Sequence, residues 1–273
     1  MITPVILTHN EDRNIRSALA SLAWAPRIVL VDSVSSDQTE EIARSFDNVD
    51  WFVRTFDNHC TQWRYAIHDT GIETEYVLAL DADMRPSLGF HDELQQFLSH
   101  RKFAGAWIPF EYRVLGRGLL GSIYPPQIRI FRKERVHIDQ PGHTQVFHVD
   151  GTLHNFTSKL IHEDHKPLSR WLRNQINYAS LEVARIRSTQ HVHLKDRLRL
   201  AGISPAIWGA YAYLKAGGPF NSGASRAYAY ERIIFEAILA RLLAEEPSTA
   251  EPIQSPIHRE TGRAALKDDS SAG

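Results

Sequence analysis

The sequence predicts an α/β protein with a largely parallel sheet flanked by helices and a helical C-terminal extension. Two observations predict this fold class. Over the first hundred residues, short apolar runs alternate with longer amphipathic segments, which is the pattern of consecutive strand-helix-strand units. From Leu168 onward, apolar residues recur at helical spacing instead. With 273 residues, 43% hydrophobic and 23% charged, the chain is large enough to bury a substantial core.

The first hundred residues predict four strands separated by three helices. The strands are residues 2–7, 28–31, 51–53 and 76–80, and the helices are residues 11–22, 37–46 and 61–68. In the first helix, Ile15, Leu19 and Leu22 fall at helical spacing, and Asn10 is placed to cap the N-terminus. The fourth strand ends abruptly at Asp81.

Two further strands are predicted at residues 103–110 and 127–131. Glycines and prolines in the segment between them indicate an irregular excursion. Helices are expected from Leu168, at residues 203–215 and at residues 227–244, with Gly217 and Gly218 interrupting the last two. The final residues, 247–273, are rich in proline, serine, threonine and charge, a composition typical of disorder.

Composition excludes several functional classes. The formal net charge is -1, so bulk electrostatics give no reason to expect a nucleic-acid partner. Cys60 is the single cysteine, which excludes an internal disulfide framework or a cysteine-rich zinc site and fits a reducing cytoplasm. The sequence shows neither a signal-peptide pattern nor an apolar stretch long enough to span a bilayer. We therefore expect a cytoplasmic protein that binds any anionic ligand locally.

Two carboxylates follow the fourth predicted strand. In a parallel sheet, ligands bind outside the carboxyl ends of the strands, and Asp81 and Asp83 occupy such a position. Separated by one residue, the two side chains can point to the same side and meet one cation. Desolvating two carboxylates is costly unless something positive joins them. The alternative is a solvated turn in which one aspartate caps a helix.

Polar loops also follow the first and second predicted strands, at the same edge as Asp81. Residues 8–11 follow the first strand, and residues 32–39 follow the second. A carboxylate such as Asp32 can accept a hydrogen bond from a uracil-type N–H or from ribose hydroxyls. As an alternative, Ser36 or Asp37 caps the helix that follows, and the two roles are compatible.

Together these motifs resemble family 2 glycosyltransferases of the GT-A fold. The resemblance rests on residues 4–11, on Asp32 with the 36–39 loop, and on the pair Asp81 and Asp83. Residues 129–132 and 171–178 extend it toward the bacterial lipopolysaccharide-core glucosyltransferase branch. The likeness covers roughly residues 1–190. It implies a Rossmann-like mixed sheet flanked by helices, with a catalytic domain at 1–190 (nucleotide-binding half 1–100, acceptor half 101–190) and a helical extension at 191–246.

The resemblance also implies roles for individual residues. Thr8, Asn10 and Glu11 would line the nucleotide pocket, with Asp37 nearby, and Asp32 would contact the base. Asp81 would lie by the ribose and the metal, with Asp83 as the direct ligand of Mn²⁺ or Mg²⁺ and His162 close to the metal or the diphosphate. Arg64 would contact the base or the diphosphate, or would be a surface arginine.

The implied reaction is the transfer of a hexosyl group, with inversion, from a nucleoside-diphosphate sugar. UDP is the nucleotide that the family favours, and a bacterial surface glycan or glycolipid, in lipopolysaccharide or exopolysaccharide synthesis, is the acceptor. Two alternatives are a sugar-nucleotide-binding protein with little transferase activity and a sugar nucleotidyltransferase. The latter usually carries a glycine-rich, basic phosphate loop after the first strand, and residues 8–11 offer none.

The catalytic base is where the sequence departs from the family pattern. Relatives in this branch place a histidine-glutamate pair after the strand at 129–132, whereas this chain has His143 followed by Thr144 and Gln145. A glutamine has no basic group. The candidates for the base are His143, whose ordinary pKa suits the role, and Asp139. Other carboxylates lie nearby in sequence, at Asp150, Glu163 and Asp164.

Residues 203–215 are aromatic and aliphatic, flanked by Lys195, Arg197, Arg199 and Lys215. This composition is typical of a segment at a membrane interface, with cations toward anionic lipid. It is equally typical of a helix packed on the protein core. If the segment lies at a membrane interface, we expect the protein to contact the inner face of the plasma membrane peripherally.

Overall fold

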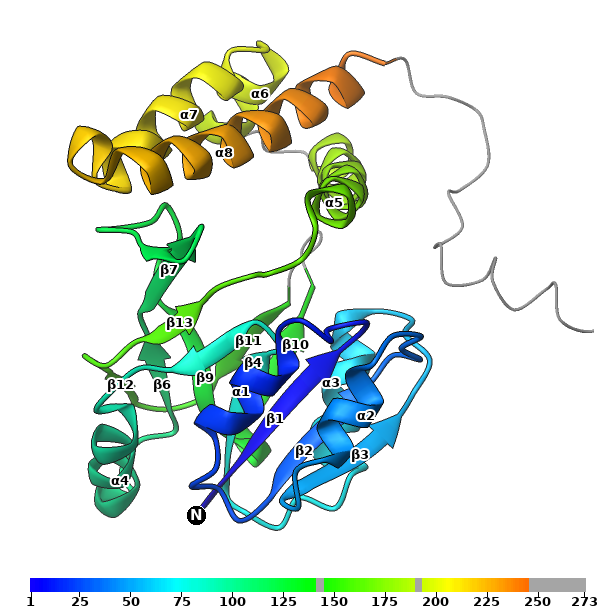
Figure 1. The fold of residues 1–273 in the computed structure, drawn as a ribbon, viewed down its shortest axis with the longest axis vertical. Coiled ribbons are helices and arrows are strands. Elements are labelled where there is room, and N and C mark those ends of the chain that lie inside the picture. The colour runs from blue at the N-terminus through cyan, green and yellow to red at the C-terminus, as the bar shows by residue number, and fades with distance from the viewer. Residues whose placement is uncertain (141–144, 190–192, 246–273) are drawn as a thin grey trace, which may run out of the picture.

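The computed structural model describes residues 1–140, 145–189 and 193–245, so His143 and the predicted tail at 247–273 lie outside the described residues. A large sheet and its helices form the lower part of Figure 1, and a group of helices lies above it. A second, smaller sheet lies between them.

The large sheet has seven strands in the order β12-β6-β9-β4-β1-β2-β3. Its strands are β1 (Ile2–Thr8), β2 (Ile28–Asp32), β3 (Val49–Val53), β4 (Tyr76–Asp81), β6 (Gly105–Ile108), β9 (Gln127–Arg132) and β12 (Leu153–Asn155). Strand β9 is antiparallel to both β4 and β6, and the other neighbouring pairs are parallel. The predicted mixed α/β sheet is therefore confirmed.

Helices cover both faces of this sheet. They are α1 (Ile15–Ser21), α2 (Thr39–Arg44), α3 (His59–His68) and α4 (Phe90–His100). Because successive strand residues point to opposite faces, Leu78 and Leu80 pack with α1, α2 and α4, whereas Val77 and Ala79 pack with α3. Burial on both faces explains why these strands are continuous apolar runs in the sequence.

The second sheet has the order β5-β13-β7-β8, and a separate hairpin pairs β10 with β11. Their bounds are β5 (Met84–Pro86), β7 (Phe110–Val114), β8 (Arg117–Gly118), β10 (Val136–Asp139), β11 (Val146–Val149) and β13 (Leu160–His162), with the short helix η1 at Lys133–Arg135. The strand predicted at 103–110 is present as β6 but ends at Ile108, because the chain leaves the large sheet at Pro109 and enters the second sheet as β7. Proline has no N–H with which to continue a ladder.

The helical region comprises α5 (Leu168–Ser188), α6 (Leu194–Leu200), α7 (Ser204–Lys215), η2 (Gly218–Asn221) and α8 (Ser222–Leu243). Figure 1 shows α8 running from above β7 to above α5. Phe235 and Leu239 of α8 pack on Ala179 and Val183 of α5. In this part of the chain as described, no helix is long and apolar enough to cross a bilayer.

Buried ion pairs join α5, α6 and α8. Arg199 is 2% exposed and donates to Glu182 and to both carboxylate oxygens of Glu236. Asp196 and Arg185 complete the group. Because each buried charge has an opposite partner, these helices are tied in one arrangement.

Candidate active site

The carboxyl ends of three adjacent strands bring the predicted loops together. Strand register places Thr8 beside Asp32 and Leu7 beside Asp81. The polar residues after β1, β2 and β4 therefore share one edge of the sheet, as the sequence predicts for parallel strands.

The loop after β1 corrects one expectation. Asn10 does not cap the first helix, because α1 begins at Ile15 with Asn14 at the N-cap position. Asn10 instead has a φ of 56°, a left-handed conformation that asparagine tolerates. Its side-chain oxygen accepts the amide N–H of Ser36 at 2.7 Å, and its own N–H donates to the Ser35 hydroxyl. Asn10 thus joins the loops after β1 and β2.

The two aspartates of the second loop are held by backbone groups. Asp32 is 2% exposed and accepts the Ser35 N–H at 2.7 Å. Burial raises the pKa of Asp32 above its usual value, although hydrogen bonds from Ser35 oppose that shift. Asp37 accepts the N–H of Thr39, the first residue of α2, although the N-cap position itself is Gln38. Its side chain therefore bonds a free N–H at the start of the helix, close to the role of the alternative interpretation.

Asp83 and His162 are brought together by the pairing of β5 with β13. His162 lies opposite Met84, the residue after Asp83, and its Nε2 is 3.6 Å from Asp83 Oδ2. The other oxygen, Asp83 Oδ1, is buried and has no hydrogen-bond partner among the described residues. A buried carboxylate oxygen without a partner is costly and indicates a missing ligand.

The donor set at this point fits a divalent cation. A carboxylate and an imidazole suit Mn²⁺, and the carboxylate suits Mg²⁺. Within residues 1–140, 145–189 and 193–245, no three histidine, cysteine or acidic side chains gather closely enough to hold a metal ion by themselves. Asp83 and His162 therefore fit a cation whose remaining ligands would come from a bound ligand or from water.

Lys166 is a central residue of the site that the sequence did not reveal. Its ammonium lies 2.8 Å from Glu11, 3.2 Å from Asp164 and 3.9 Å from Asp83. Burial opposes its charge, but these three carboxylates outweigh burial and raise the Lys166 pKa. Burial also raises the pKa of Glu11 to about 7, with Lys166 lowering it and Asp83 raising it.

Asp81 has a second cation as its partner. Arg129 of β9 is 3% exposed and places Nη2 at 3.1 Å from Asp81 Oδ2. Desolvation raises the pKa of Asp81, but the charges of Arg129 and His59 outweigh it and leave that pKa below its usual value. The sequence identified Arg129 only as part of a strand motif, because its proximity to Asp81 depends on the β4-β9 pairing.

Helix α5 lies against the same edge. Arg170 donates to the backbone carbonyls of His9 and Asn10, which fixes α5 to the loop after β1. Tyr178 of the same helix is subject to the charges of Asp83 and Asp81, and burial raises its pKa. Tyr178, the last residue of the predicted motif at 171–178, therefore lies near the site.

Two other predicted residues lie on the surface. Arg64 is exposed on α3, between buried Trp63 and half-buried Tyr65. The Asp139 side chain is 71% exposed at the end of β10, and its Oδ2 lies 3.4 Å from His148 Nε2. The roles assigned to Arg64 and Asp139 stay predictions.

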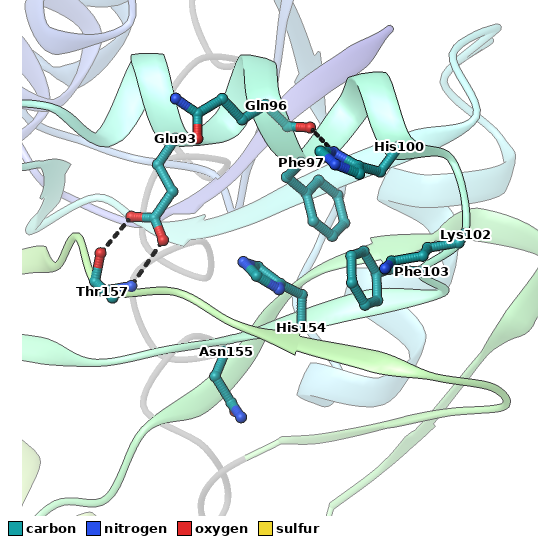
Figure 2. Close-up of a pocket in the computed structure, with 9 residues that line it drawn as sticks. All are labelled: Glu93, Gln96, Phe97, His100, Lys102, Phe103, His154, Asn155 and Thr157. Carbon is teal, nitrogen blue, oxygen red and sulfur yellow. Dashed lines mark hydrogen bonds between the residues drawn. The ribbon is translucent and has the colours of Figure 1, made fainter.

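A cavity of about 350 Å³ lies elsewhere, between α4 and the edge strand β12 (Figure 2). Phe97, Phe103 and His154 line it. Both oxygens of Glu93 at its rim accept hydrogen bonds from Thr157 and the neighbouring Ser158. This carboxylate is already satisfied, in contrast to Asp83.

Comparison with known proteins decides the family. The model of "Glycosyl transferase family 2" matches residues 3–154, from β1 into β12. The chain belongs to glycosyl transferase family 2. The GT-A architecture and helical C-terminal region predicted for this glycosyltransferase are thereby confirmed.

The solved structures to which the chain is similar include those of S. aureus TarS. The structure of TarS 1-349 in complex with UDP-GlcNAc is 13% identical, with a TM-score of 0.48, over 88% of this chain and 90% of that chain. The complex of TarS 1-349 with UDP is 13% identical, with a TM-score of 0.47, over the same shares of the two chains.

Proposed function

We propose that this family 2 glycosyltransferase is a metal-dependent, inverting hexosyltransferase that uses a nucleoside-diphosphate sugar, with UDP as the nucleotide. The observation that carries the proposal is the buried Asp83 oxygen without a partner, beside His162. A ligand there must be positive or must donate hydrogen bonds. A cation bound to a diphosphate satisfies this requirement at the edge of the sheet where family members bind their donor.

The nucleotide is proposed to lie across the loops after β1 and β2. Thr8, Asn10 and Glu11 line one side, and Asp32 and Asp37 line the other. The hydroxyl of Thr8 is buried without a hydrogen-bond partner among the described residues, so it is available to a ligand. The hydrogen bonds between Asn10 and the 35–36 loop hold both sides in place before binding. Arg64 stays a proposed contact for the base or the diphosphate.

The metal is proposed to be held by Asp83 and His162, with Asp81 close by. When bound, a divalent cation stabilises the negative charge that develops on the leaving diphosphate. Arg129 keeps Asp81 ionised and fixes its orientation through the 3.1 Å contact. Lys166 adds a fixed positive charge on the Glu11 side of the same site.

A bacterial surface glycan or glycolipid is the proposed acceptor class, with α7 in peripheral contact with the membrane. One face of α7 packs on α8, where Gly209 meets Ile233, so core packing accounts for part of the segment. On α7 and η2, Tyr211, Leu214 and Phe220 stay exposed, at 41%, 68% and 92%. Lys215 lies over the Tyr211 ring, which supports an interface with anionic lipid.

The test is calorimetric binding of UDP in the presence of Mn²⁺. Asp83→Asn is expected to lose the metal-dependent part of the affinity, because a neutral amide is a poor ligand for a divalent cation. EDTA is expected to have the same effect on the wild type. The matched control is Asp47→Asn, which changes an exposed aspartate outside the site. Unchanged Mn²⁺-dependent binding in Asp83→Asn contradicts the proposal.

Product analysis with a panel of nucleotide sugars separates the proposal from its two alternatives. Free nucleoside diphosphate is the expected product of transfer or hydrolysis. Pyrophosphate as the product would indicate nucleotidyl transfer instead. Binding of the nucleotide sugar with neither product would support a binding protein.

A further inference from the structure

Glu231 lies on the face of α8 that is turned toward the rest of the protein. It is in the middle of this helix, three residues after Tyr228 and four before Phe235. Tyr228 packs with Tyr112 and Ile123, and its hydroxyl accepts the N–H of Ile123. Phe235 packs on α5. Residues three and four apart share a helix face, so Glu231 points in the direction of both contacts.

Tyr112, against which Tyr228 packs, has its ring centroid 4.7 Å from that of His162, so this face of α8 is turned toward the candidate active site. The segment that joins β13 to α5 passes beneath α8 in Figure 1. The segment contains Asp164, and its charge acts on Glu231. Asp164 in turn contacts Lys166, which is 3.9 Å from Asp83. Glu231 therefore lies on the face of α8 that is turned toward the candidate active site.

Glu231 differs from the other inward-facing carboxylate of α8. Glu236 is fully buried and is paired with Arg199 and Arg232. Glu231 forms no hydrogen bond or ion pair with the residues that the structure describes. Tyr228, one helical turn before it, is uncharged and does not supply an ion-pair partner. Burial raises the pKa of Glu231 to about 7, and the negative charge of Asp164 adds to the shift. Such an unpaired carboxylate at a site needs a functional reason.

The other carboxylates near the site already have partners. Glu163 lies 2.5 Å from Arg85, and Asp164 is bonded to Lys166 and Asn14. Asp139 is exposed and lies beside His148. Glu163 and Asp164 are thus paired and Asp139 is exposed, whereas Glu231 is half-buried and without an ion-pair partner among the described residues.

We propose that Glu231 is the general base that activates the acceptor. This inference rests on the proposed function. The Glu231 carboxylate takes the proton of the acceptor hydroxyl, and the oxygen of that hydroxyl forms a bond to the anomeric carbon of the donor. The bond from that carbon to the diphosphate breaks, and its electron pair leaves with the nucleoside diphosphate. The proton then passes from Glu231 to water.

The experiment uses UDP-GlcNAc as the donor probe and water as the acceptor, with the full chain. Release of UDP is measured for the wild type, Glu231→Gln and Glu231→Ala, and UDP affinity is measured by calorimetry with Mn²⁺. We expect Glu231→Gln to lower the rate of UDP release by about 10²- to 10⁴-fold, the usual contribution of a general base, with UDP affinity within about twofold. Sodium formate is expected to restore part of the Glu231→Ala activity, because it supplies an external carboxylate.

The matched control is Glu245→Gln, the same chemical change in an exposed residue just beyond α8. Glu245→Gln is expected to keep the wild-type rate. If Glu231→Gln retains a rate within fivefold of the wild type, the inference is overturned. It is also overturned if Glu231→Gln loses UDP affinity in parallel with rate and formate restores nothing, since Glu231 then supports the fold or the donor. A wild type that releases no UDP from any nucleotide sugar refutes the proposed function itself.

Discussion

Removal of Lys166 is the sharpest perturbation of the site. In Lys166→Met, the carboxylates of Glu11, Asp83 and Asp164 lose their shared ammonium. The Lys166 side chain is 10% exposed, and those of Glu11 and Asp83 are 13% and 14% exposed, so solvent screens the contacts little. Removing one partner of a buried ion pair costs about 3–5 kcal/mol, and protonation of Glu11 relieves part of that cost. We expect a loss of about 3 kcal/mol in the free energy of unfolding at pH 7.

That loss corresponds to a fall in Tm of roughly 6–12 °C for a domain of this size, measured by calorimetry in EDTA. The loss depends on pH. The folded pKa of Glu11, about 7, lies above its ordinary 4.5, so the stability linked to its protonated form is lost as pH rises through 7. Lys166 lowers that pKa, and its removal makes ionised Glu11 still less favourable. The variant is therefore expected to be further below the wild type at pH 8 than at pH 6.

Lys159→Met is the matched control, because Lys159 is exposed on the same domain. It is expected to change the unfolding free energy by less than about 0.5 kcal/mol. Addition of Mn²⁺ with UDP is expected to reduce the difference in unfolding free energy between Lys166→Met and the wild type, since a bound cation restores positive charge beside Asp83. A variant as stable as the wild type at both pH values would show that the three carboxylates do not depend on Lys166, which refutes the reasoning.

Three further predictions concern other parts of the molecule. Arg129→Met is expected to lower the free energy of unfolding by about 2 kcal/mol, measured by urea denaturation, because Asp81 loses its cation. A change near zero contradicts the pairing of Arg129 with Asp81. Between pH 4 and pH 8, the unfolding free energy of Glu231→Gln is expected to rise by up to about 3 kcal/mol relative to that of the wild type. The reason is that the wild-type carboxyl has a folded pKa of about 7 against an ordinary 4.5, so the wild type loses stability as pH rises. A stability difference that stays constant with pH in thermal unfolding would exclude the pKa shift. In flotation with anionic liposomes, Leu214→Asp with Phe220→Asp is expected to abolish co-migration, whereas Leu88→Asp is not; failure of the wild type to co-migrate refutes membrane contact.

The parallel part of the sheet was predictable because each of its strands has a recognisable pattern of consecutive residues. Strands β1, β2 and β4 are buried on both faces, so each is an uninterrupted apolar run. Asp81 and Asp83 follow such a run directly. Helix α4 was not predicted, although its buried residues Phe90, Leu94 and Phe97 fall at helical spacing. Strands β10 to β13 were not predicted because each is only three or four residues long. Pro109 ended a predicted strand early, since the backbone there passes from one sheet to another.

The Asn10 expectation failed for a related reason. As an isolated residue before a helical pattern, asparagine is a good N-cap. Its actual hydrogen bonds are with Ser35 and Ser36, which belong to the next strand-helix unit. Local pattern alone does not distinguish a cap from a contact between loops.

By itself, the sequence determined the fold class, the family and the sheet edge that gathers Asp32, Asp81 and Asp83, because short-range periodicity and motifs at strand ends encode them. Only the tertiary structure decided which cations meet those carboxylates. Arg170 reaches Asn10 across 160 positions, and Lys166 approaches Glu11 in the same way. Glu231 comes from α8, beyond the family match that ends at residue 154. No local pattern specifies such encounters, because they depend on how helices and sheets pack.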